Sequence, residues 1–105
     1  MAFHKWGSIF LGLGTEDPRS NRAVIEHGGL TTTIVAVPDR AAVVKAAVAL
    51  VEDGAQLIEL CGAFGPVATA QVIKAVGDRV PVGSVSYGLE SAPALAAPFS
   101  PPMTT

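Results

Sequence analysis

Four short runs of β-forming residues alternate with helix-forming segments, and this alternation constrains the fold more than any other feature of the chain. The runs cover residues 6–13, 31–37, 56–61 and 80–87, and the second is dominated by β-branched side chains. Strands that alternate with helices form mostly parallel sheets joined by right-handed crossovers. The sequence therefore predicts a small α/β domain with the element order βαβαβαβ.

Three segments between the strands have helical features: residues 39–53, 66–76 and 19–26. Asp39 is a favourable N-cap for the first helix, and Gly54 ends it. Pro66 suits the first turn of the second helix, Gly77 ends that helix, and Gly28 ends the third. Helical spacing predicts two apolar faces that pack on the sheet, one made of Val44, Ala47, Val48 and Val51 and the other of Val72, Ile73 and Val76.

These elements together predict a three-layer domain of the flavodoxin or Rossmann type. We expect a four-stranded, mostly parallel sheet with the strands in the spatial order 2-1-3-4. The chain has 105 residues, which is the length of one domain. We assign residues 1–90 to that domain and residues 91–105, which are rich in proline and have no period, to an irregular C-terminal tail.

Composition excludes several classes of protein. Seven Lys and Arg stand against nine Asp and Glu, and this net charge of −2 argues against nucleic-acid binding. No apolar run approaches the roughly 18 residues of a membrane span. A single cysteine excludes a disulfide framework and, without an export signal, predicts a cytoplasmic protein. We expect no cofactor and no metal, because the two histidines have no suitably spaced carboxylate.

The most informative motif is the glycine-rich turn of residues 62–66, which joins a strand to a helix. In open parallel sheets, ligands bind beyond the carboxyl ends of the strands. Free N–H groups at the start of a helix favour an anion there. The predicted ligand-binding residues are Gly62, Phe64, Gly65, Val67, Ala68, Arg40 and Tyr87. The alternative is an ordinary strand-to-helix turn whose glycines serve only the backbone geometry.

Glu59 is out of place on a strand otherwise built from leucine, isoleucine and cysteine. A carboxylate in such a setting suits general acid/base chemistry, because burial raises its pKa. Ser84 and Ser86 share a face of the following strand, and we expect them beside Glu59 as a polar stripe. The alternative for Glu59 is a hydrogen bond to a neighbouring strand or a place in a subunit contact.

Cys61 follows two residues later and is a candidate nucleophile or redox thiol if the helix start lowers its pKa. The alternative is a small buried hydrophobic residue. The predicted catalytic residues are therefore Glu59, Cys61 and Ser86. Arg40, which follows the N-cap residue Asp39, is a candidate partner for an anion or an ordinary solvated residue at a helix start.

The whole chain resembles an uncharacterised family of small bacterial α/β proteins, known only as a domain of unknown function. Two stretches carry the resemblance: residues 54–66 and residues 80–88. The resemblance implies a fold and no activity.

A shorter stretch, residues 55–66, is similar to the strand and turn that hold a catalytic glutamate in the tryptophan synthase α chain. Glu59, Leu60 and Phe64 match that pattern, whereas Cys61 replaces a glycine and Gly65 stands where a serine-aspartate pair begins. That family folds as a (β/α)₈ barrel, which needs about twice the length of this chain. The similarity implies a role for Glu59 and transfers no substrate.

Two hypotheses for the function follow. The first is a small-molecule binding protein or small enzyme for an anionic or carboxylate ligand, with Glu59 as the acid/base. The alternative is a non-catalytic structural or accessory subunit. In either case we predict a homo-oligomer, because the apolar residues Leu95, Phe99 and Met103 of the tail are costly to leave in water.

Overall fold

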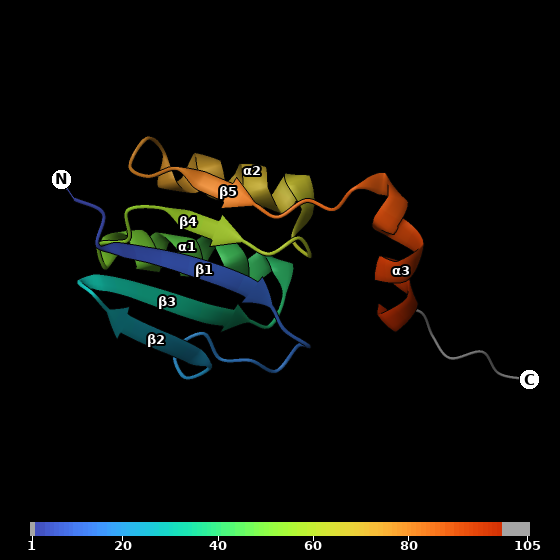
Figure 1. Ribbon diagram of the computed structural model, residues 1–105, viewed down its shortest axis with the longest axis horizontal. Coiled ribbons are helices and arrows are strands. Elements are labelled where there is room, and N and C mark those ends of the chain that lie inside the picture. The colour runs from blue at the N-terminus through green and yellow to red at the C-terminus, as the bar shows by residue number, and fades with distance from the viewer. Residues whose placement is uncertain (1, 100–105) are drawn as a thin grey trace, which may run out of the picture.

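The computed structural model describes residues 2–99, which form a five-stranded mixed sheet with helices packed on it (Figure 1). The strand order is β2-β3-β1-β4-β5, and every neighbouring pair is parallel except β2 and β3. The α/β class is confirmed, with five strands rather than four. The helices and strands are β1 (Lys5–Leu11), β2 (Arg22–His27), β3 (Leu30–Val37), α1 (Val43–Glu52), β4 (Ile58–Leu60), α2 (Gly65–Val76), β5 (Val82–Ser84) and α3 (Ala92–Ala96).

The helix predicted over residues 19–26 is wrong, because this segment contains the edge strand β2. His27 pairs with Leu30 across Gly28 and Gly29, whose φ angles are +59° and +83°. A two-residue hairpin turn of type I′ has positive φ at both central positions, which glycine adopts without strain. The two glycines therefore close a β-hairpin instead of ending a helix.

This one difference also makes the three-layer, flavodoxin-like or Rossmann-like prediction wrong. The four predicted strands do lie in the expected order, β3-β1-β4-β5, with β2 added outside β3. The crossovers through α1 and α2 both run in the same direction across the sheet, so right-handed connections place both helices on one face. The connection from β1 to β3 runs in the opposite direction, and a helix in it would have covered the other face, but this connection contains β2 instead. The domain therefore has two layers, and Figure 1 shows both helices behind the sheet.

The face of the sheet under α1 and α2, here called the covered face, holds the hydrophobic core. Gly7 lies where α1 comes closest, since a Cβ at this position would stand 2.7 Å from Cδ1 of Leu50. Asp39 caps the short 3₁₀ turn before α1 as predicted, and its Oδ1 accepts the N–H of Ala42 at 3.0 Å. Fully buried core side chains are Ile9, Val35, Val37, Val43, Ile58, Leu60, Val72 and Val76.

The buried stripes of the helices differ from the predicted ones. The buried stripe of α1 is made of Val43, Ala46, Ala47 and Leu50, which includes the expected Ala47, and the expected Val44 and Val51 are half-buried and pack against the core from its side. On α2, Ile73 is 49% exposed rather than packed on the sheet. Both helices are apolar on several sides, so helical spacing alone does not fix which side faces the core.

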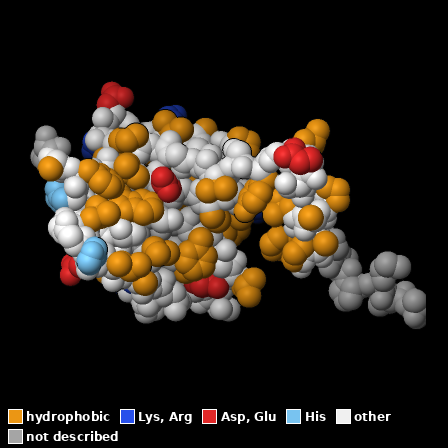
Figure 2. Space-filling model, viewed as in Figure 1, with side chains coloured by type: hydrophobic (Ala, Val, Ile, Leu, Met, Phe, Trp, Pro, Cys, Tyr) orange, Lys and Arg blue, Asp and Glu red, His pale blue; other side chains and the backbone are white. Residues whose placement is uncertain are grey.

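The opposite face of the sheet, here called the open face, has no helix on it. Its apolar side chains gather across the strands in Figure 2, and several are strongly exposed, including Phe10 at 43% and Ile25 at 55%. Strand register and the alternation of side chains place the following residues on it: Trp6, Ser8, Phe10, Ile25, Thr32, Ile34 and Glu59.

Residues 89–99, here called the C-terminal arm, form short helical turns around α3 that stand away from the sheet (Figure 1). The prediction of an irregular tail is wrong for residues 91–99. Pro93 lies in the first turn of α3, where its missing N–H costs no hydrogen bond. All residues of the arm except Ser91 are exposed. Met103 and the remainder of the predicted tail lie outside the described residues.

Candidate functional site

The carboxyl ends of the parallel strands form one edge of the sheet, and two cavities flank the beginning of α1 there. The first, here called the turn cavity, lies between the starts of α1 and α2. The second, here called the basic cavity, lies on the other side of α1, towards β2. Four of the seven Lys and Arg residues of the chain line these two cavities. In a chain of net charge −2, this edge is therefore the region suited to an anion.

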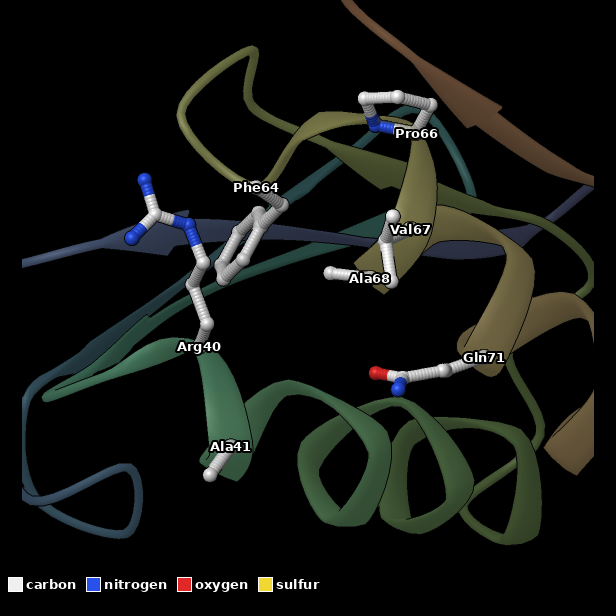
Figure 3. Close-up of a pocket in the computed structure, with 7 residues that line it drawn as sticks. All are labelled: Arg40, Ala41, Phe64, Pro66, Val67, Ala68 and Gln71. Carbon is white, nitrogen blue, oxygen red and sulfur yellow. The ribbon is translucent and has the colours of Figure 1, made fainter.

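The turn cavity has a volume of about 330 Å³ and brings together four of the seven predicted ligand-binding residues: Arg40, Phe64, Val67 and Ala68. In Figure 3 the Arg40 side chain extends alongside the Phe64 ring, and the Gln71 amide points into the space between the helices. Nε of Arg40 donates to the carbonyl of Ala63 at 3.1 Å, which holds the guanidinium beside the turn. The start of α2 has no side-chain cap, so its first N–H groups remain available.

The glycines of the turn have different tasks. Gly65 has a φ of +76° and open space around its Cα, so glycine is required there by the backbone conformation. A Cβ at Gly62 would instead lie 3.0 Å from the Tyr87 ring and 3.1 Å from the carbonyl of Val85. The space beside Gly62 is therefore filled by residues 85–87 of the same chain and is not open to a ligand. Tyr87 packs over Gly62 and lines none of the cavities that flank α1.

Glu59 lies apart from the turn, on the open face of the sheet. Its register neighbours are Ser8 on β1 and Gly83 on β5. Ser84 pairs with Leu60 and so points to the covered face, which makes the predicted stripe of Glu59 with Ser84 and Ser86 wrong. The error follows from a one-residue difference in register, which moves every side chain of a strand to the other face. Ser86 is exposed beyond the end of β5.

Cys61 is half-buried and is in contact with the main chain of β1. Its Sγ lies 3.4 Å from the N–H of Leu11, and the side chain packs against the hydrophobic core. The structure therefore places Cys61 between β1 and the turn. Glu59, Cys61 and Ser86 line neither the turn cavity nor the basic cavity, and their catalytic role stays a prediction.

The basic cavity was not predicted from the sequence. Its volume is about 530 Å³, and three segments contribute its cations: Arg19 from the β1–β2 loop, Arg22 from the start of β2 and Lys45 from α1. Nε of Arg22 donates to the carbonyl of Pro18 at 3.0 Å. The remaining lining is mostly apolar and consists of Asp17, Pro18, Pro38, Ala42, Ala46 and Ala49.

Asp17 is the acidic residue in the basic cavity, and it is already engaged. Its Oδ1 accepts the N–H of Arg19 at 3.0 Å and lies 3.7 Å from Nε of the same residue. The backbone hydrogen bond is the main cause that holds the pKa of Asp17 below its ordinary value, and the positive charge of Arg19 adds to it. The cations of Arg22 and Lys45 therefore dominate the field in the cavity.

The β1–β2 loop holds an anion of its own. The carboxylate of Glu16 accepts the N–H groups of Leu13 at 2.8 Å, Gly14 at 2.9 Å and Thr15 at 3.1 Å. These hydrogen bonds lower the pKa of Glu16, and the one from Leu13 has the largest effect. A Cβ at Gly12 would collide with the same carboxylate, so a side chain there would displace Glu16 from these hydrogen bonds. The backbone donors of this loop are thus already satisfied by Glu16.

Residues 2–99 contain no group of three His, Cys, Asp or Glu side chains placed to hold a metal ion. No helix in the described part of the chain combines the length and the apolarity needed to cross a bilayer.

The fold and its cavities define a two-layer α/β domain with a basic edge and one uncovered sheet face. The chain belongs to DUF6506, a family of unknown function whose model matches residues 4–100. This confirms the resemblance to an uncharacterised family, and no comparison supports the local similarity to the tryptophan synthase α chain. No curated protein and no solved structure matches the chain.

Proposed function

We propose that this protein binds a small anionic organic molecule in the basic cavity. One observation carries the proposal: Arg19, Arg22 and Lys45 come from three separate segments and meet at one cavity, in a chain whose net charge is negative. Charges of one sign that line a concave site raise the local concentration of a ligand of opposite sign.

The size and lining of the basic cavity favour an organic anion over a bare inorganic ion. Its volume of about 530 Å³ lies within the range of small-molecule sites, roughly 300–1,000 Å³. The proline and alanine side chains of the lining suit a carbon skeleton, and the guanidinium groups suit carboxylate or phosphate oxygens. The cations are exposed to solvent, so we expect weak, salt-sensitive binding with dissociation constants of roughly 1 mM, or about 4 kcal/mol.

A titration followed by amide NMR shifts tests the proposal. The probes are citrate, glucose 6-phosphate and inorganic phosphate, with glucose as the uncharged control. We expect citrate and glucose 6-phosphate to shift the amides of residues 17–22 and 42–49, and glucose to shift none. Lys45→Gln should weaken binding by about two- to fivefold, the size expected of one exposed ion pair. Lys74→Gln, which removes an exposed lysine from α2, is the matched control and should bind like the parent.

The turn cavity is the second candidate place for the same ligand class. It is favoured by the Arg40 guanidinium, which is held beside the uncapped start of α2. Shifts at residues 62–68 that disappear in Arg40→Gln and persist in Lys45→Gln would move the site there. Shifts that are absent from both regions up to roughly tens of millimolar probe would contradict anion binding at this edge altogether.

The acid/base role of Glu59 stays a prediction, and the geometry lends it little support. The Glu59 side chain is exposed, lines neither the turn cavity nor the basic cavity, and has no hydrogen bond or ion pair to any described residue. A catalytic carboxylate needs a bound substrate within hydrogen-bond reach. Binding without catalysis therefore agrees best with the positions of these residues.

A further inference from the structure

We propose that a second copy of this chain covers the open face, and that each copy lays its C-terminal arm on the face of the other. The proposal does not depend on the proposed function, because the apolar side chains of the open face, such as Phe10, Ile25 and Ile34, do not line the basic cavity. It also gives a place to Leu95 and Phe99, two of the apolar tail residues from which we predicted a homo-oligomer.

The uncovered sheet is the first observation. Strands β3, β1, β4 and β5 form a parallel ladder, and parallel sheets are almost always covered on both faces. Here the outward side chains include Trp6 and Phe10 on β1 and, on the neighbouring strand β3, Ile34, which lies opposite Ser8 and so diagonally between them. Figure 2 shows apolar side chains spread across this face. A contiguous apolar surface of this kind indicates a contact with another protein.

The C-terminal arm is the second observation. Leu89 is 89% exposed, Leu95 41% and Phe99 79%, although these are the large apolar side chains of the segment. The contacts of α3 are chiefly with the short turns on either side of it, within the arm. Residues 85–88 connect the arm to β5 without regular structure. The arm thus exposes apolar side chains and leaves the domain in a direction that does not cover its own sheet (Figure 1).

The area that a stable dimer interface needs favours a contact that includes both the open face and the C-terminal arm. Five strands about 4.8 Å apart make a face about 20 Å wide, or roughly 400 Å² in projection at the length of β1. A stable interface takes about 800 Å² from each partner. The projected area of the face alone is about half of this accessible area, and the arm supplies apolar area that is otherwise unused.

A second copy is the occupant that this chain itself specifies. The arm carries no Lys or Arg, and Glu90 is its single acidic residue, so its surface is as apolar as the face that it would cover. Because face and arm belong to the same chain, a two-fold axis satisfies both faces and both arms at once and closes the assembly.

Sedimentation velocity of the full chain and three variants tests the proposal. Ile25→Lys changes the open face and Leu95→Lys changes the arm. Ile73→Lys is the matched control, since Ile73 is 49% exposed on α2 and Ile25 is 55% exposed on β2. We expect the parent and Ile73→Lys to sediment as dimers at about 100 μM, a concentration that fills interfaces of micromolar affinity. For Ile25→Lys and for Leu95→Lys, the dissociation constant of the dimer should be at least tenfold higher than for the parent. The circular dichroism spectrum of each variant should be unchanged.

Mixing the two weakened variants distinguishes an exchanged arm from one that folds back on its own sheet. A heterodimer of Ile25→Lys with Leu95→Lys retains one intact arm on one intact face, so the mixture should contain dimers that neither variant forms alone. A monomeric parent chain would overturn the proposal. Equal dissociation of Ile25→Lys and Ile73→Lys would overturn it as well, and so would a mixture that behaves as the sum of its parts.

Discussion

The two faces of the sheet are built from alternate residues of the same strands and yet meet different surroundings. On β1, Ile9 is fully buried under the helices, whereas Phe10 is 43% exposed on the open face. Both are large and apolar, so hydrophobicity does not explain the difference. The direction of the crossovers does, because both helical connections run the same way across the sheet and place their helices on one side. The covered face therefore stabilises the monomer, while the open face is left exposed and is available for contact with a second copy.

The largest expected effect comes from the covered face. Leu60 is 1% exposed in the core of the covered face. Leu57, which lies just before β4 and by strand alternation on the side of Glu59, is half-buried. Leu60→Ala should lower the free energy of unfolding by about 2–5 kcal/mol, because it leaves a cavity that the core cannot close. Leu57→Ala should cost clearly less. Urea unfolding at low protein concentration measures both, and equal losses would contradict the distinction between the faces.

The next effect compares two glycines that face opposite sides of the sheet. Gly7→Ala places a methyl group against the end of the Leu50 side chain and should cost about 1–3 kcal/mol. Gly83→Ala meets only Cγ of Glu59 at 4.0 Å and should change the monomer little. Thermal unfolding of Gly7→Ala and Gly83→Ala measures the loss of stability in each variant. A larger loss for Gly83→Ala than for Gly7→Ala would mean that the open face is the tightly packed one.

Glu59→Gln sharpens the comparison on the open face itself. Glu59 has no partner among the described residues, so covering it with a second copy buries an uncompensated charge. Removing the charge should tighten dimerisation by roughly tenfold, whereas Glu52→Gln, an exposed glutamate of α1, should leave it unchanged. Sedimentation equilibrium reads both variants. Weaker association of Glu59→Gln would show that the partner supplies a counter-charge.

The smallest effect lies in the β1–β2 loop and depends on pH. The backbone donors of Leu13 and Gly14 lower the pKa of Glu16 in the folded chain below its ordinary value of 4.5. The folded state therefore binds fewer protons than the unfolded state around that pH, and the contribution of Glu16 to stability is present above it and lost as the pH falls. Between pH 6 and 3, Glu16→Gln should lose less stability than the parent. Parallel pH profiles would contradict this.

Local signals in the sequence were sufficient for most of the elements. The N-cap at Asp39, the proline at the start of α2 and the four parallel strands all rest on short-range chemistry. The pair Gly28 and Gly29 also carried a hairpin signal, and assigning Gly28 as a helix end concealed it. That single local error accounts for the wrong number of layers.

The candidate site was less predictable, because tertiary contacts assemble it. Arg40, Phe64, Val67 and Ala68 come together as expected from helix starts at one edge of a parallel sheet. Lys45 joins Arg19 and Arg22 only because the β-hairpin folds the loop back beside α1. The register that separates Ser84 from Glu59 depends on where β5 begins, which alternation alone does not specify.

The five isoleucines of the chain allow the most direct test of the account, which holds that the open face is buried by a second copy. With methyl-labelled protein and a soluble paramagnetic probe, Ile9 and Ile58 report the core, and Ile73 reports the outer surface of α2. Ile25 and Ile34 report the open face. We predict that raising the protein concentration protects the methyl groups of Ile25 and Ile34 from the probe while Ile73 stays accessible. Ile25 and Ile73 relaxing alike at every concentration would contradict the account.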